Sequence, residues 1–531
     1  MSALTGTGAL IRLILRRDRF LLPLWILLLP LLLLIQPSAT TELFPTPAQL
    51  ETYAYTLRTP ALVALYGPVF DSNLGALSVT RAGFTPVILA LVSLLTVIRH
   101  TRTEEEAGRR ELLGASVVGR HANLAAALVV VFGANLVVGT VVAAGMATQD
   151  LAAGGSLAAG LAYASVGCMF ATVGAVAAQL TEGAGAARGL ALSGLGVAFV
   201  LRLGGDVGGD GMSWLSWLSP IGWGQQIRPY ADERWWVLVL AAGFVVAFAA
   251  AAVALSSRRD VGAGLLPSRP GPAVASPRLN SPLALAFRLH RGMLVAWTAG
   301  LAVLGLVLGG VAEGVGDLVA DSPELEEIFV RMGGPARLVD AYLAANMGVL
   351  ALIASGYAIQ AGLRMRTEET TLRAEPVLAA AVDRVRWATG HLTFALVGPS
   401  LAVAAGGLTT GLAHGLATGD LGRELPRVLG GAVAQLPAVW LLAGIAIALF
   451  GLFPRFTAAS WGALGLFFFI GWLGPVLQLD EWVMNLSPFT HLPDLPGGEL
   501  QAPPLLWIVG MAITLTIAGL SGFRRRDVGS A

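Results

Sequence analysis

Two short charged segments are the part of the chain where chemistry or recognition can be expected. Arg102-Thr-Glu-Glu105 recurs as Arg366-Thr-Glu-Glu369, and at the same offset Arg109 matches Arg373. On a helix, Glu105/Arg109 and Glu369/Arg373 would form i,i+4 ion pairs worth about 0.3–0.5 kcal/mol each. Two interpretations are open: a solvated charged helix, or a docking surface for another protein. Retention of the pattern in both copies favours docking.

The docking hypothesis covers acidic and basic residues of both segments. They are Glu104, Glu105, Glu106, Arg109 and Arg110 in the first segment, and Glu368, Glu369 and Arg373 in the second. In the first segment Glu106/Arg110 is a further i,i+4 pair, whereas Ala374 replaces Arg110 in the second. The two surfaces would therefore not be equivalent.

Other residue types argue against chemistry within this chain. All 34 basic residues are arginine, so the chain lacks the lysine that a phosphate-binding loop requires. If ATP drives this protein, ATP and Mg²⁺ must be bound by a separate subunit. The single cysteine, Cys168, lies in an apolar run and is interpreted as a packing residue, and the six histidines show no metal-ligand spacing. We expect no enzyme active site and no metal site. The net charge of +1 gives no indication of a nucleic-acid partner, and none is expected.

The composition of the chain indicates which kind of structure holds the two charged segments in place. The chain is 55% hydrophobic, only 13% charged, and has a mean hydropathy of +0.72, whereas soluble proteins carry about 25% charged residues. Apolar runs near 20 residues, long enough to cross a bilayer, recur along it. The sequence predicts an all-α membrane protein with about twelve spans, near 20–36, 82–98, 122–147, 151–180, 186–203, 235–255, 293–312, 344–363, 388–413, 428–452, 457–479 and 503–522.

The loops predict the orientation of these spans. Arginine concentrates at the N-terminus, in the even-numbered loops and at the C-terminus, so these sides are expected to be cytoplasmic. Long outer segments follow at about 37–81 and 313–343. The span at 186–203 is the weakest, because Arg188 and Arg202 lie close together. An alternative for the first span is a cleaved signal peptide.

An internal repeat organises the chain. Leu218-Ser-Pro220 recurs as Leu486-Ser-Pro488, and Arg258-Arg-Asp-Val-Gly262 recurs as Arg525-Arg-Asp-Val-Gly529. Six spans in each copy make this a parallel repeat. We predict a first six-span half at 1–262, a proline-rich linker at 263–282 and a second half at 283–531. Each Ser-Pro pair fits a helix start, which suits either a re-entrant helix or a plain turn.

Polar residues inside the predicted spans are few. Those present are Asn135, Gln179, Asn346, Gln360 and Gln435. Such isolated polar residues are more often interhelical hydrogen-bonding groups than ligand contacts. Ionisable groups, which ion and proton relays need within the membrane, are almost absent away from the span ends.

With these motifs, the chain resembles permease subunits of bacterial ABC exporters, in the fused actinobacterial type known as exporters of polyketide antibiotics or multidrug efflux permeases. The resemblance rests on 104–113 with its partner 368–373, the Leu-Ser-Pro pairs and the Arg-Arg-Asp-Val-Gly ends. It covers nearly the whole chain. It implies a multi-pass protein of the bacterial plasma membrane that exports hydrophobic molecules such as antibiotics or drugs, and can thereby confer antibiotic resistance.

The resemblance also implies roles for particular residues. The charged segments would be coupling helices that contact two copies of a separate ABC ATPase, and residues 8–19 would form an amphipathic elbow helix. The substrate would pass between the halves by alternating access, along the second and fifth spans of each. Candidate residues of this path are Asn346, Gln360, Phe467, Phe468 and Trp472, although lipid-facing packing fits the aromatic residues as well.

Two other functional classes remain open at this stage. A secondary transporter of the major-facilitator kind also has two six-span halves, but its usual Asp-Arg-x-Gly-Arg-Arg-like motif after the second span is absent. A membrane scaffold or a lipid-processing protein would share the composition. The substrate and the identity of the ATPase are not given by the sequence.

Overall fold

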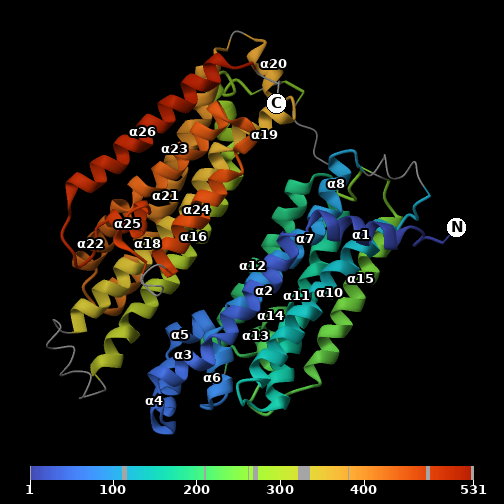
Figure 1. Ribbon diagram of the computed structural model, residues 1–531, viewed down its shortest axis with the longest axis vertical. Coiled ribbons are helices and arrows are strands. Elements are labelled where there is room, and N and C mark those ends of the chain that lie inside the picture. The colour runs from blue at the N-terminus through green and yellow to red at the C-terminus, as the bar shows by residue number, and fades with distance from the viewer. Residues whose placement is uncertain are drawn as a thin grey trace. The chain divides into compact units, whose positions relative to one another are not determined.

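The computed structural model describes residues 2–109, 117–208, 211–260, 262–266, 273–274, 276–320, 335–380, 382–473 and 479–527; side chains at a few further positions are not described. All regular secondary structure in these ranges is helical (Figure 1). The chain forms two compact units, Met1–Gly271 and Pro272–Ala531. The prediction of an all-α fold is confirmed.

The first unit contains long helices together with several short ones. They are α1 Thr7–Arg17, α2 Leu21–Leu34, α3 Gln36–Leu43, α4 Pro47–Leu57, α5 Pro60–Tyr66, α6 Leu74–Arg81, α7 Thr85–His100, α8 Arg102–Glu106, α10 Ala122–Ala147, α11 Ala153–Leu180, α12 Ala184–Val207, α13 Trp214–Trp217, α14 Pro220–Gln226 and α15 Val237–Ser257. Within this unit, α1 and α8 lie at one end and α3–α6 at the other (Figure 1).

The second unit is built in the same manner. Its helices are α16 Pro282–Ala320, α18 Pro335–Gly362, α19 Arg364–Thr370, α20 Ala374–Leu378, α21 Arg384–Ala417, α22 Leu421–Ala434, α23 Leu436–Leu452, η1 Pro454–Phe456, α24 Ala459–Leu473, α25 Glu481–Met484, η2 Pro488–His491 and α26 Ala502–Arg525. Here α19 and α20 lie at the end of the unit where the chain ends, away from α22 and α25 (Figure 1).

The described residues contain eleven helices or helix pairs that are long and apolar enough to span a membrane. They match eleven of the twelve predicted spans, so the chain is a multi-pass membrane protein. The span thought weakest is a continuous 24-residue helix, α12. Its expected counterpart is the short one: α24 has 15 residues, and 474–478 lie outside the described residues.

Small residues allow the helices of each unit to pack closely. In the first unit, a Cβ added at Gly139 or Gly160 would collide with the other glycine's backbone carbonyl. In the second, a Cβ at Gly451 would collide with the Gly519 carbonyl, and one at Gly519 with the backbone of Ile447, so α23 and α26 also pack closely. Helices inside a bilayer associate through such close packing and interhelical hydrogen bonds, because lipid is as apolar as their side chains.

The two Ser-Pro pairs begin different helices. Ser219 is the N-cap of α14, and its Oγ accepts a hydrogen bond from the Gly222 N–H at 3.3 Å. Ser487 precedes the short 3₁₀ helix η2 and makes no such bond. The predicted helix start is thus confirmed, with a full α-helix only in the first unit.

The long segment after α2 also contains short helices, among them α5, which Thr59 precedes. In the second unit, the described residues from 335 onward belong to the long helix α18. At the other end of the first unit, the helix expected at 8–19 is α1, which buries Leu10 and Ile14 and exposes Arg12 and Arg16.

Candidate functional site

A buried ion-pair cluster holds the first charged segment, and we call it the Glu105 cluster. Arg259, just after α15, donates from both Nη atoms to the two carboxylate oxygens of Glu105, each at 2.8 Å. Arg102 donates to the same carboxylate at 3.0 Å, and the Gly262 N–H donates at 2.8 Å. Glu105 is 6% exposed and Arg102 only 1%. Such a bidentate charged pair fixes both distance and direction.

The second unit repeats this arrangement in what we call the Glu369 cluster. Arg526, just after α26, donates to the two carboxylate oxygens of Glu369 at 2.6 and 2.8 Å. Arg366, on α19, donates to Glu369 at 3.4 Å. Glu369 is 3% exposed. In each unit, therefore, a glutamate of a short helix, α8 or α19, binds the residue that follows the unit's last long helix.

A third arginine belongs to each cluster. It lies at or just before the start of the long helix α10 in the first unit and α21 in the second. Arg120 donates to the carbonyl oxygen of Arg259 at 3.1 Å, and Arg384 donates to that of Arg526 at 2.7 Å. The guanidinium surroundings differ: Arg259 Nε donates to Gln179 Oε1 at 2.8 Å, whereas Arg526 lies 4.9 Å from the Phe450 ring centroid. The sequence showed that Arg259 matches Arg526 and Glu105 matches Glu369, but gave no sign that arginine and glutamate meet.

The remaining residues of the first segment contact neighbouring helices. Glu104 accepts hydrogen bonds from Arg109 at 2.7 and 3.0 Å and pairs with Arg17 of α1. Glu106 accepts a hydrogen bond from the Ala184 N–H at 2.9 Å, in the first turn of α12. Arg109 is half exposed, and Arg110 lies outside the described residues. This loop is thereby tied to three helices: α1, α12 and α15.

The second segment is tied to fewer elements and exposes an apolar side chain. Glu368 accepts a hydrogen bond from Arg364 at 2.8 Å and is buried, while Arg373 is exposed. Leu372 stands at the loop apex with a left-handed φ of +59° and is 58% exposed. The matching residue in the first unit is Gly108, with φ of +70°.

The predicted i,i+4 pairs are wrong for the described residues. Helix α8 ends at Glu106, and the left-handed Gly108 turns the chain, so Arg109 contacts Glu104 instead of Glu105. In the second unit α19 ends at Thr370 and Leu372 turns the chain, so Glu369 binds Arg526 rather than Arg373. The predicted pair Glu106/Arg110 lies partly outside the described residues.

The predicted substrate-path residues are scattered over three kinds of environment. Asn346 is 9% exposed, and its Nδ2 has no hydrogen-bond partner. Gln360 is exposed and accepts a hydrogen bond from Trp297 Nε1 at 2.9 Å. Phe467 lines a cavity within the second unit, whereas Phe468 is 45% exposed. The side chain of Trp472 lies outside the described part of the chain. Their role in transport stays a prediction.

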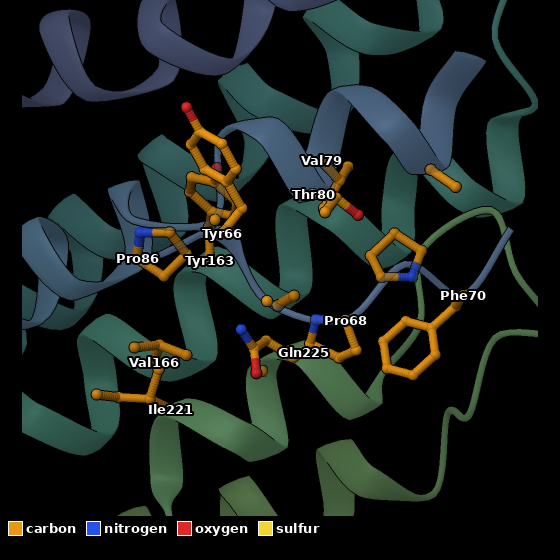
Figure 2. A pocket seen from close by; sticks show the side chains of 16 residues that line it. Tyr66, Pro68, Phe70, Val79, Thr80, Pro86, Tyr163, Val166, Ile221 and Gln225 are labelled. Atoms are coloured by element: carbon orange, nitrogen blue, oxygen red, sulfur yellow. The ribbon is translucent and has the colours of Figure 1, made fainter. Parts of the chain in front are cut away.

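The first unit contains a small cavity beside the segment that follows α2. Figure 2 shows Tyr66, Pro68 and Phe70 from this segment beside Tyr163 of α11 and Gln225 of α14. Its volume is ≈ 50 Å³, whereas sites for drug-sized ligands usually measure about 300–1,000 Å³. In this conformation the cavity is therefore too small for such a ligand.

A buried ion pair beside this cavity was not singled out from the sequence. Arg202 Nε lies 2.7 Å from Asp206 Oδ2, and both side chains are almost fully buried in α12. Arg202 also donates to the carbonyl oxygens of Ala64 and Val63 at 3.1 and 3.3 Å, which fastens the end of α5 to α12. The i,i+4 spacing of Arg202 and Asp206 was the available signal.

A pair of buried histidines lies inside the second unit. His290 Nε2 and His391 Nδ1 lie 3.0 Å apart, both buried, between α16 and α21. Among the described residues, no group of three or more His, Cys, Asp or Glu side chains could hold a metal ion.

The chain is 45% identical over 529 residues to the multidrug efflux system permease protein Rv1217c of Mycobacterium tuberculosis (strain ATCC 25618 / H37Rv), covering 99% of this chain and 96% of that protein. The chain belongs to this family of multidrug efflux permeases. The family described as "Multidrug efflux system permease Rv1217c, C-terminal domain" matches residues 279–524. The predicted resemblance is confirmed, and this permease is a multi-pass membrane protein.

Proposed function

We propose that this permease is the membrane-spanning part of an ATP-driven exporter of lipophilic or amphipathic molecules. The relative it matches carries the name of a multidrug efflux system permease. A permease without a nucleotide site of its own needs an energy source, and this sequence has no lysine for a phosphate-binding loop. ATP and Mg²⁺ would be held by two copies of a separate ABC ATPase.

The observation that carries the proposal is the pair of Glu105 and Glu369 clusters. Each cluster joins an exposed loop to the end of the last long helix of its unit. A protein that pushes on this loop would move that helix, because a buried bidentate ion pair resists both stretching and rotation. The exposed Arg109 and Arg373 would meet the ATPase, while the buried Glu105 and Glu369 would pass its movement inward.

In this mechanism the two halves alternate between states open to opposite sides of the membrane. ATP binding would favour one state and hydrolysis the other, so each ATPase state must interact differently with the two conformations. The substrate would enter from the cytoplasm or inner leaflet and leave outward. Asn346, Gln360 and Phe467 are proposed contacts along its path.

The direct test is reconstitution of this permease with a co-expressed ATPase encoded beside it. We expect the two proteins to purify together and vesicles containing both to move a fluorescent lipophilic dye only when ATP is supplied on the ATPase side. An ATPase variant lacking its phosphate-binding lysine is the control. Dye movement by the permease alone, driven by a proton or sodium gradient, would instead support an ion-coupled secondary transporter.

A further inference from the structure

The second unit contains a cavity of ≈ 870 Å³ between α23, α24, η2 and α26. Its size lies within the range of about 300–1,000 Å³ that is usual for small-molecule sites. Among the described residues its walls are mainly apolar, and the polar side chains of Asn485 and His491 enter beside η2. Residues that define it are Ile445, Phe467, Asn485, His491, Met511 and Leu515.

Helix α15 of the first unit can be compared with α26, because the two helices bury side chains at equivalent positions. The arginines that end these helices, Arg258 and Arg525, are 267 positions apart. At this offset three buried residues of α15 coincide with three buried residues of α26. The pairs are Ala241 with Ile508, Ala252 with Gly519, and Ser256 with Phe523. The two helices therefore turn equivalent faces toward their units.

In the first unit, aromatic side chains lie at the positions that correspond to the cavity of the second unit. Phe244 stacks on Phe248 with 4.0 Å between ring centroids, and Trp223 meets Phe244 edge-on at 5.9 Å. At the matching positions of α26 stand smaller side chains, Met511 and Leu515. Counting from the Leu-Ser-Pro motifs, Trp223 corresponds to His491. All three replacements line the cavity.

We infer that this cavity binds a lipophilic molecule with an extended chain or ring system and one polar group. Ile445, Met511 and Leu515 would contact the apolar part, and flexible methionine adapts to different shapes. Asn485 and His491, whose Nε2 lies 3.0 Å from the Asn485 carbonyl oxygen, would face the polar group. Two sources share this chemistry: a membrane phospholipid and the exported compound, the second of which rests on the proposed function.

The inference can be tested by replacing two residues that line the cavity with the phenylalanines that stand at the matching positions of the first unit. The variant M511F/L515F is compared with I513F/I517F, which adds the same rings to α26 at positions that are 54% and 58% exposed. Each full-length protein is purified in nanodiscs and photolabelled with either a diazirine-bearing phosphatidylethanolamine or azido-rhodamine. Peptide mass spectrometry then locates the label.

In the unaltered protein we expect the label on η2 and α26, reduced at least fivefold in M511F/L515F and unchanged in I513F/I517F. Cavity-dependent labelling by the phospholipid identifies a lipid site, and by azido-rhodamine a site for the exported compound. Labelling that never reaches η2 or α26, or that the filled variant retains, would overturn the inference. Intact cavity labelling in a protein without ATP-driven export would contradict the proposed function alone.

Discussion

At the scale of single residues, Glu105 and Glu369 have a different position from the one their sequence suggested. Both were predicted to belong to a docking surface, yet both are buried against an arginine more than 150 positions away. Removing either carboxylate would leave the arginines that donate to it without their buried partner, which is costly. These residues therefore stabilise the permease as well as position its loops.

Replacing Glu369 by glutamine should destabilise the second unit. The change leaves Arg526 without its bidentate partner, and we expect a loss of about 3 kcal/mol, the lower end for a broken buried pair because Arg526 is 16% exposed. Thermal unfolding in detergent measures it. The exposed Glu375 gives the matched control, because Glu375→Gln should change stability by no more than about 0.5 kcal/mol. Equal effects of both substitutions would refute a special role for Glu369.

Leu372 should matter for partner binding and not for folding. A leucine with positive φ costs about 1 kcal/mol or more, so Leu372→Gly should leave the free energy of unfolding unchanged or raise it. The same change removes the exposed apolar side chain, and we expect several-fold weaker co-purification of the ATPase. Leu372→Asn, which tolerates the same backbone conformation while being polar, should behave alike. Undiminished ATPase recovery with both variants would exclude this contact.

At the scale of elements, the sequence predicted most of the fold because a bilayer imposes a simple rule. Any stretch near 20 apolar residues must form a helix that satisfies its own backbone. The ends of the short charged helices were harder to predict. Helix α8 ends at Glu106 before the left-handed Gly108, and α19 ends at Thr370 before the left-handed Leu372. The ion pairs at i,i+4 spacing were consequently predicted wrongly.

Contacts between distant elements were beyond the sequence argument for a different reason. A repeated motif shows that two copies meet the same constraint, but it does not say which other residue supplies it. Arg259 and Arg526 were noticed only as part of a terminal motif, and their bonds to Glu105 and Glu369 depend on how α15 and α26 pack. The Arg202–Asp206 pair, by contrast, was readable from its spacing.

Helix α26 provides a paired test of close packing. Gly519→Leu should destabilise the second unit strongly, because a Cβ there collides with the backbone of Ile447 and Ala448 in α23. Gly510→Leu on the same helix should be tolerated, because nothing lies within 4 Å of its added Cβ. Yield of folded protein and thermal unfolding in detergent measure the difference. Comparable behaviour of the two variants would contradict the described packing of α23 on α26.

At the scale of the whole molecule, the two units offer related but unequal surfaces to a partner. In the first loop Arg109 binds Glu104, and Gly108 forms the turn. In the second loop Arg373 is exposed beside the exposed Leu372. Two identical ATPase copies would therefore bind with different affinities. Unequal halves also fit the ligand cavity, which is formed where the second unit lacks the aromatic residues of the first.

Single-loop variants should reveal this inequality. Arg109→Glu should release one ATPase copy, Arg373→Glu the other, and the double variant both, since each charge reversal turns an attraction at one loop into repulsion. Native mass spectrometry of the complex counts the copies. Loss of both copies from either single variant would show that they bind cooperatively and not through independent loops.

The glycine contact between α23 and α26 also sets the scale of movement available to the second unit. Two helices whose backbones touch travel as a single rod, and α26, with its 24 residues, is about 36 Å long at 1.5 Å per residue. Tilting that rod by about 5° around its anchored end would displace the opposite end by about 3 Å. A rotation of a few degrees imposed at the Arg526 end thus becomes a shift of about 3 Å at the opposite end of the helix.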